Sequence, residues 1–169
     1  MKFSKLFFVA SLVSASFLSP ATLMAQEDTD EAPQVVNWAT QCSATVRDGE
    51  ISCFMEQKIA LRESGQLVVA ITIQVPPETR VPAVVIQVPL GVFLPGGVIA
   101  QVDDGLAQTY EIKTCDQVGC YAGDPLSSEL LTAMETGETL NIKFQNFSQE
   151  EIVIPVPLTG FLDSYYKIR

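Results

Sequence analysis

The residues with the greatest capacity for chemistry are carboxylates and cysteines, because the chain contains no histidine. Without histidine, a Ser-His-Asp triad, a Cys-His pair and a histidine-ligated metal are all excluded. A pair of carboxylates could still supply the acid and the base of a glycoside hydrolase. The candidates for that role are Asp103, Asp104, Asp116, Glu150 and Glu151.

Local turn chemistry explains these carboxylates more simply. Asp103-Asp104-Gly105 has the composition of a turn, and Glu150-Glu151 fit a solvated loop. The spacing at Asp103-Asp104 also lacks the ligand pattern of a known calcium loop. We therefore predict no catalytic residue, no metal site and no cofactor. A carboxylate-based hydrolase of envelope glycans is kept as an alternative.

The first 25 residues have the layout of a secretory signal peptide. Lys2 and Lys5 precede an apolar run from Leu6 to Leu18, and small residues lead to a cleavage boundary after Ala25, with Ala21 as a second candidate. The run of about 13 residues is shorter than the roughly 20 that a membrane-spanning helix needs. The sequence therefore predicts an exported protein with no membrane span after cleavage.

The mature chain has the length of one domain. We expect residues 26–34 to be a flexible acidic leader and residues 35–169 to be a single domain. The whole chain has a net charge of −10, and the loss of Lys2 and Lys5 makes the mature protein more acidic still. An acidic chain without a basic patch repels nucleic acid and anionic lipid, so neither is expected as a partner.

The four cysteines, Cys42, Cys53, Cys115 and Cys120, all lie in the mature chain and allow three pairings. Export to an oxidising compartment favours disulfides, and the spacing of CDQVGC matches neither a CxxC redox motif nor a zinc ribbon. We predict local pairing, Cys42 with Cys53 and Cys115 with Cys120. Each bond would staple a hairpin and contribute roughly 2–3 kcal/mol.

The segment between Cys42 and Cys53 predicts a hairpin with Asp48-Gly49 at its turn. A strict two-residue turn would pair Ala44 with Cys53, whereas a bulge or a longer loop would bring the two sulfurs closer, so the register stays open. Trp38, just before this hairpin, is expected to pack in the core. A ligand-stacking role for Trp38 is the alternative, and with it a small-ligand-binding periplasmic module.

Short alternating runs separated by turn residues predict an all-β sandwich. Strands are expected at 35–41, 52–61, 67–75, 84–88, 98–102, 110–115, 140–144 and 152–156. One inserted helix is expected between Ser127 as its cap and Gly137 at its C′ position, with Asp124-Pro125 as a rival start. A short closing helix is expected within 159–167.

Two blocks, PLGVFLPGGV from Pro89 and TCDQVGC from Thr114, carry a family resemblance. Further elements match in order: Trp38 before Cys42, Cys53 before Gln57, Val102-Asp103, and Leu130-Leu131 with Met134 and Gly137. From Trp38 to Phe161 the chain resembles the invasion-associated locus B family of bacterial exported proteins.

This resemblance implies an immunoglobulin-like β-sandwich in the periplasm or on the outer surface of a Gram-negative bacterium. The family takes its name from a link to host-cell invasion in a pathogenic member, and that activity is not carried over to this chain. The resemblance transfers no catalytic residue. We therefore expect a non-enzymatic module that acts by contacts with an envelope or host protein.

Overall fold

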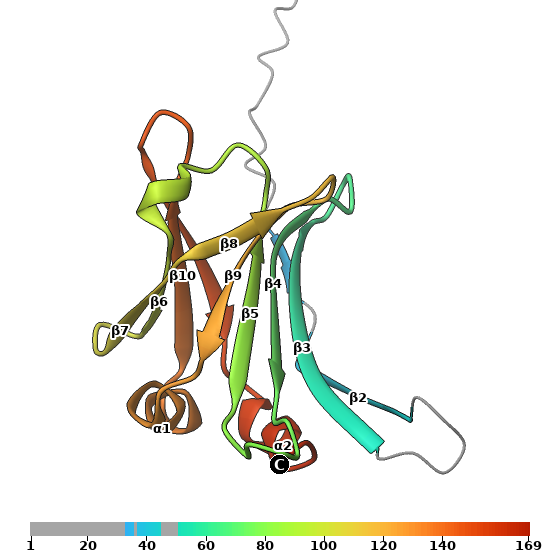
Figure 1. Cartoon of the computed structure of the whole chain (residues 1–169). Coiled ribbons are helices and arrows are strands. Elements are labelled where there is room, and N and C mark those ends of the chain that lie inside the picture. The colour runs from blue at the N-terminus through green and yellow to red at the C-terminus, as the bar shows by residue number, and fades with distance from the viewer. Residues whose placement is uncertain (1–32, 36, 45–50) are drawn as a thin grey trace, which may run out of the picture. The chain divides into compact units, whose positions relative to one another are not determined.

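Two antiparallel β-sheets face one another in the computed structural model, which describes residues 33–35, 37–44 and 51–169 (Figure 1). The predicted signal peptide lies outside the described residues. The architecture is the immunoglobulin-like β-sandwich that the sequence predicted, with one inserted helix and one short helix near residue 169. All strand pairs in both sheets are antiparallel, which suits the short turns between most neighbouring strands.

The larger sheet has seven strands. They are β1 (Pro33–Val35), β2 (Ala39–Ala44), β3 (Ile51–Leu61), β4 (Leu67–Gln74), β5 (Ala83–Val88), β8 (Ile112–Cys115) and β9 (Cys120–Pro125). Their order is β1-β3-β4-β5-β9-β8, and β2 also pairs with β3. Strand β1 pairs with Leu61 to Ile59 and β2 with Glu56 to Ile51, so both lie along the same edge of β3. Strand pairing therefore begins at Pro33, two residues before the predicted domain boundary.

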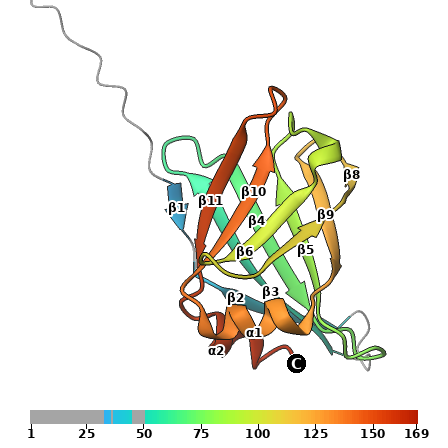
Figure 2. The same ribbon diagram turned by 90° about the vertical axis from the view of Figure 1, so that its left-hand side faces the viewer.

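The smaller sheet has the order β11-β10-β6-β7. Its strands are β6 (Val98–Val102), β7 (Ala107–Tyr110), β10 (Thr139–Gln145) and β11 (Glu151–Pro157). The helices are a short 3₁₀ turn, η1 (Leu94–Gly96), with α1 (Ser128–Thr136) and α2 (Phe161–Tyr165). Helices α1 and α2 lie together at one end of the sandwich, beneath the strands in Figure 2.

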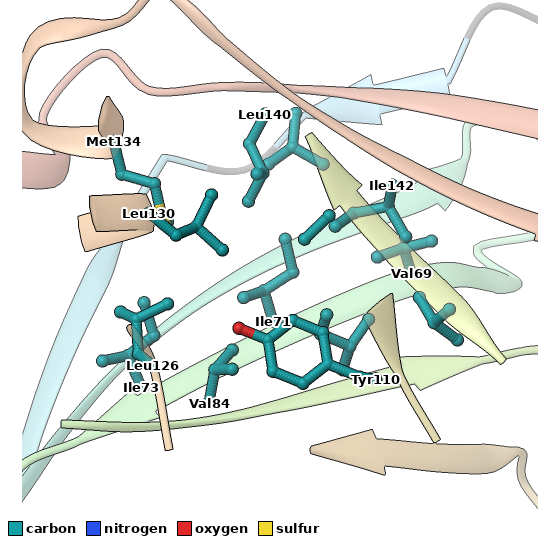
Figure 3. Packing of buried hydrophobic residues seen from close by; sticks show 14 of the residues in the cluster. Val69, Ile71, Ile73, Val84, Tyr110, Leu126, Leu130, Met134, Leu140 and Ile142 are labelled. Atoms are coloured by element: carbon teal, nitrogen blue, oxygen red, sulfur yellow. The ribbon is translucent and has the colours of Figure 1, made fainter. Parts of the chain in front are cut away.

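Alternating apolar side chains of the two sheets meet in one core (Figure 3). Val69, Ile71 and Ile73 of β4 are fully buried, as period-2 alternation predicted, and Leu140 and Ile142 come from the opposing sheet. Leu130 and Met134 add the apolar face of α1 to the same cluster, and Leu126 joins it from the segment just before the helix. Burying this much apolar surface is the main force that holds the sheets together.

Tyr110 is the one buried residue of this cluster whose polar atom has no partner among the described residues. The residue is 1% exposed, and its hydroxyl lies among apolar side chains (Figure 3). Burial, and then the negative charge of Asp124, raise the pKa of the Tyr110 phenol to about 12. The phenol therefore stays neutral in the core, since ionisation there would be costly.

The predicted strand at 110–115 is wrong, because this segment contains two strands in different sheets. Strand β7 ends at Tyr110 in the smaller sheet, and β8 starts at Ile112 in the larger one. The side-chain alternation continues through the crossing at Glu111, so periodicity alone could not reveal the change of sheet.

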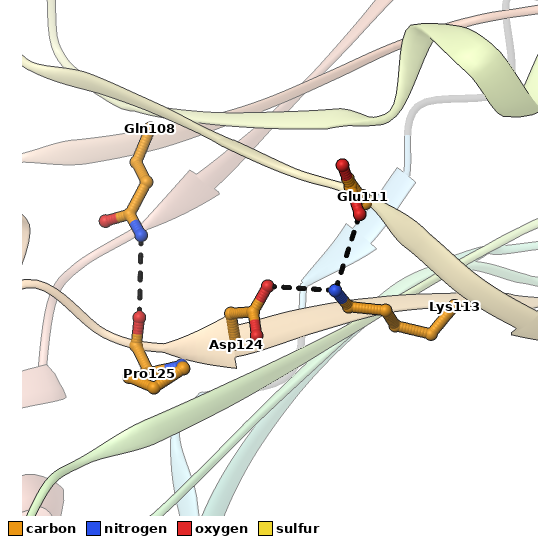
Figure 4. A network of polar contacts seen from close by, with 5 residues as sticks. All are labelled: Gln108, Glu111, Lys113, Asp124 and Pro125. Carbon is orange, nitrogen blue, oxygen red and sulfur yellow. Dashed lines mark hydrogen bonds and ion pairs between the residues drawn. The ribbon is translucent and has the colours of Figure 1, made fainter.

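Polar contacts hold the corner at this crossing (Figure 4). The ammonium of Lys113 lies 3.6 Å from the carboxylate of Glu111 and 3.2 Å from that of Asp124. Gln108 Nε2 of β7 donates to the backbone oxygen of Pro125 in β9, at 3.5 Å. These contacts join β7 and β8, the strands on either side of the crossing, to the same strand, β9.

Helix α1 begins as the sequence predicted, with Ser127 as its cap. The Ser127 hydroxyl accepts a hydrogen bond from the backbone N–H of Leu130 at 3.2 Å. The rival start at Asp124-Pro125 is wrong, because these two residues end β9, where they pair with Val84 and Ala83. Asp124 and Pro125 are therefore held in β9 by strand pairing and by the contacts at the crossing, and they cannot form the first turn of a longer helix.

Gly137 ends α1, as the sequence predicted. Its φ is −81° and its ψ is 173°, so it is extended rather than left-handed. A Cβ at this position would overlap Val102 Cγ1 and would lie 2.9 Å from Ala133 O and from Asp103 Oδ2. Glycine is required here because the end of α1 packs directly against the turn that follows β6.

Substitution Gly137→Ala is expected to destabilise the protein by about 1–3 kcal/mol, the usual cost of forcing a methyl group into packed surroundings. Gly105→Ala is the matched control, because its new Cβ would meet only Val102 O, at 3.4 Å. Urea unfolding of both variants measures the difference. Equal stability of the two variants would contradict this explanation of Gly137.

Candidate interaction site

The carboxylates that could have acted as acid and base instead hold turns. Asp103 accepts hydrogen bonds from the backbone N–H groups of Thr139 and Glu138, at 2.9 and 3.2 Å. Glu150 accepts one from Asn146 Nδ2 at 2.8 Å, within the loop between β10 and β11. These contacts are those of turn and loop residues, as the simpler interpretation predicted.

Asp116 has the same kind of role in the turn between β8 and β9. Its carboxylate accepts from the backbone N–H groups of Val118 and Gly119, at 2.8 and 3.1 Å, and from the hydroxyl of Tyr121 at 3.0 Å. The hydrogen bond from Val118 is the first cause that lowers the pKa of Asp116 below its ordinary value. A carboxylate held ionised in this way is a poor general acid.

The candidate carboxylates also lie in separate turns. Asp103 and Asp104 follow β6, Asp116 follows β8, and Glu150 and Glu151 precede or begin β11. Within the part of the chain that the structure describes, no three Cys, Asp or Glu side chains are grouped closely enough to hold a metal ion. The fold does not bring these residues into one site.

Trp38 is a core residue, and it is also the point where the chain leaves the sandwich. It is 6% exposed, and its ring meets the ring of Phe161 edge to face, with centroids 5.1 Å apart. Trp38 Nε1 donates to the backbone oxygen of Pro157 at 3.1 Å, and Ser164 Oγ donates to the backbone oxygen of Trp38 at 3.2 Å. The strand predicted over 35–41 is therefore interrupted here, between β1 and β2.

Beyond Trp38 the strands β2 and β3 form an exposed ribbon, which we call the arm (residues 39–44 and 51–54). Seven of its residues are exposed, and Ile51 reaches 66%; the seven are Ala39, Gln41, Cys42, Ser43, Ala44, Ile51 and Ser52. The arm diverges from β4 and β5 at the lower edge of the larger sheet (Figure 1). A two-stranded ribbon without a covering layer is marginally stable on its own.

The Cys42–Cys53 disulfide staples the arm across its two strands. The two residues are directly opposite each other in the register, with Ser43 opposite Ser52 and Ala44 opposite Ile51. The strict two-residue turn, which would have paired Ala44 with Cys53, is therefore wrong, and the connection is longer. Asp48 and Gly49 lie outside the described residues.

The second disulfide joins Cys115 to Cys120 across the turn between β8 and β9. Both bonds are thus the local pairs that the sequence predicted. The two hairpins differ in their surroundings, because Cys120 is buried against the sandwich core whereas Cys42 is exposed on the arm. The Cys42–Cys53 bond is the one that supports a structure standing outside the core.

A pocket of about 240 Å³ lies beside the arm and has a basic wall. Arg80, Lys167 and Arg169 line it, together with Ser52 and Cys53 of the arm. Among the described residues, no carboxylate forms an ion pair with any of these three cations. The sequence did not predict this basic patch, because Arg80 lies far from Lys167 and Arg169 in the chain and only the fold brings the three together.

Both segments of the basic wall are held in place by local contacts. The backbone N–H of Arg80 donates to Pro76 O at 2.8 Å, which closes the turn after β4. Ile168, between Lys167 and Arg169, is buried in the core. The guanidinium of Arg169 lies 3.8 Å from the centre of the Tyr166 ring. The backbone that carries the three cations is therefore fixed, while their side chains are exposed.

Exposed apolar side chains gather at another set of loops, remote from the arm in the sequence. Leu90 and Leu94 lie around η1, and Phe147, in the loop between β10 and β11, is 87% exposed. The bridge between Val92 and Asn146 joins these two loops. Phe147 is therefore an exposed apolar residue that does not belong to the arm.

The family model for the Invasion associated locus B (IalB) protein matches residues 38–169. The chain belongs to this family. The match begins at Trp38, the residue that anchors the arm, and includes both disulfides. No curated protein matched the sequence.

Among solved structures, the chain is similar to one titled "Crystal structure of invasion associated protein b from bartonella henselae". The two share 22% sequence identity with a TM-score of 0.67, and the alignment covers 78% of this chain and 89% of the other. At this level of identity, the similarity shows only that the two proteins share a fold. Among its described residues, the chain has no helix long and apolar enough to cross a membrane.

Peptide mapping of the protein without reduction is expected to yield two linked peptide pairs, one with Cys42 and Cys53 and one with Cys115 and Cys120. Each pair is opposite in an antiparallel register, so no rearrangement of the strands is needed to form the bond. Alkylation before digestion detects free thiols. Crossed pairs or labelled thiols would contradict the stapled arm.

Proposed function

We propose that this member of the invasion associated locus B family is an exported, non-enzymatic protein that acts by contacts with an envelope or host protein. The observation that carries the proposal is the arm, a ribbon with exposed faces that a disulfide holds in strand form. Exposed strand edges are recurrent sites of protein recognition, because their unpaired backbone groups accept a partner strand.

Two features support export: the layout of residues 1–25 and the two disulfides. Residues 1–25 have the layout of a cleavable signal peptide. Two disulfides are the usual feature of a protein that folds in an oxidising compartment. The periplasm or the outer surface of a Gram-negative bacterium fits both features.

The absence of an enzymatic role is supported by how the carboxylates are used. Asp103, Asp116 and Glu150 each hold a turn through backbone or side-chain hydrogen bonds, and they lie in different turns. Burial of Trp38 in the core also removes the basis for a ligand-stacking site at that residue. Contacts between proteins are the function that the remaining exposed features support best.

Fractionation of the producing cell is expected to place the protein outside the cytoplasm with Gln26 as its first residue. Cleavage after Ala25 fits the small residues that end the predicted signal peptide. N-terminal sequencing or intact mass of the fractionated protein measures this. A cytoplasmic protein that retains residues 1–25 would contradict export.

The oxidised mature protein is expected to recover a specific partner from envelope or host-cell extracts in a pull-down. Ile51→Asp, at an exposed arm position, should lose that partner, whereas Phe147→Asp, at an exposed position in the loop between β10 and β11, should keep it. Failure of the unaltered protein to recover any partner would contradict the proposed function. Equal recovery by both variants would contradict the arm as its site.

A further inference from the structure

Strand β3 continues past the end of its neighbour β4. Pairing between them starts at Phe54 opposite Gln74, because Pro76 and Pro77 prevent β4 from continuing. No described strand pairs with Ile51, Ser52 or Cys53 on that side, and we call these three residues the overhang. The backbone groups that the overhang directs toward this side are free to pair with an added strand.

Two other sheet edges, β11 and β8, carry features that discourage such pairing. Strand β11 contains Pro155 and Pro157, which lack a backbone donor. Strand β8 has a register irregularity between Ile112 and Thr114. The overhang has neither proline, charge nor bulge. The outer edge of β2 is similarly unprotected, so the experiment below distinguishes it from the overhang.

Pockets lie on both faces of the overhang. The pocket with the basic wall includes Ile168, which is buried in the core, so it is on the inner side of the sheet. A second pocket of about 250 Å³ includes Gln74, which points outward because its neighbour Ile73 is buried. Ile51 and Ser52 line both pockets. An added strand would direct alternate side chains into the two pockets.

The charge of the inner pocket selects the chemistry of the ligand. Arg80, Lys167 and Arg169 line it without an ion-pair partner among the described residues, although the chain as a whole has a net charge of −10. Arginine and lysine side chains in such an arrangement bind carboxylates well. The overall negative charge disfavours nucleic acid or an anionic lipid surface, whereas a short peptide with one carboxylate meets mainly the local wall.

We propose that the overhang binds an extended acidic peptide, which adds as a strand beside β3 and places a carboxylate between Arg80, Lys167 and Arg169. The inference rests on the proposed function, and it names the binding segment and the chemistry of the partner. The disulfide partner Cys42 lies on the opposite side of β3, so the staple keeps the overhang extended without occupying its free edge.

The test is an NMR titration of the oxidised mature protein with the peptide Thr-Val-Thr-Val-Glu, which has a free terminal carboxylate, at low salt. The triple variant Arg80→Gln, Lys167→Gln, Arg169→Gln should weaken binding about tenfold, since each exposed charge pair contributes a few-fold. Arg62→Gln is the matched control, because Arg62 is an exposed cation just beyond the far end of β3. This control should change the affinity less than about twofold.

The residues whose NMR chemical shifts change show whether the peptide adds as a strand beside the overhang. The amides of Ile51, Ser52 and Cys53 should shift, and those of them that point away from β2 should become protected from exchange when the peptide binds, because successive N–H groups of a strand face opposite sides. Protection on the outer edge of β2 instead, or equal binding of Thr-Val-Thr-Val-Lys amide, would overturn the proposal. So would binding of inorganic phosphate to the basic wall with no peptide-dependent protection of the overhang, which would indicate a simple anion site.

The pull-down separates failure of this inference from failure of the proposed function. If the triple variant recovers the same partner as the unaltered protein, the acidic-peptide site is wrong and the proposed function stands. If neither protein recovers a partner, the proposed function itself is contradicted. Circular dichroism of the variant confirms that its fold is retained before either comparison.

Discussion

The arrangement of the exposed arm depends on the anchoring of Trp38. Its indole lies against Phe161, its Nε1 donates to Pro157 O, and its backbone oxygen accepts from Ser164 Oγ. These contacts join the edge of the larger sheet to the end of β11 and to α2. They fix the place where the chain stops being part of the core and begins the arm.

The same anchor positions the basic wall. Phe161 packs on Trp38, and its ring stacks with that of Tyr165 at 5.9 Å, so α2 is fixed against the sandwich. The turn after α2 then buries Ile168 and leaves Lys167 and Arg169 exposed beside the arm. The aromatic contacts thus fix the helix that precedes Lys167 and Arg169, whereas Arg80 is positioned separately by the turn after β4.

Much of the fold could be predicted from the sequence, because local patterns determine it. Alternation identified β4 and β10, the Ser127 cap identified the start of α1, and the spacing of the cysteines identified both disulfides. The crossing at Glu111 could not be predicted, since alternation continues through it. Gly137 was recognised as the end of α1, but the close approach of Val102 that requires it is a tertiary contact.

The candidate site was the least predictable part. The arm follows from the different lengths of β3 and β4, and the basic wall combines Arg80 with residues near the opposite end of the sequence. The residues whose types first pointed to chemistry, Asp103 and Asp116, proved to hold turns. Side-chain type was informative here only once the backbone partners of each group were known.

The central claim is that the Cys42–Cys53 bond holds an otherwise unsupported ribbon in strand form, ready for recognition. Amide hydrogen exchange of the unaltered protein and of the double variant Cys42→Ser, Cys53→Ser tests it most directly. We predict that paired amides of β2 and of β3 from residue 51 to 54 exchange much faster in the variant, while those of β10 are unchanged. Equal protection of the arm in the two proteins would contradict the account.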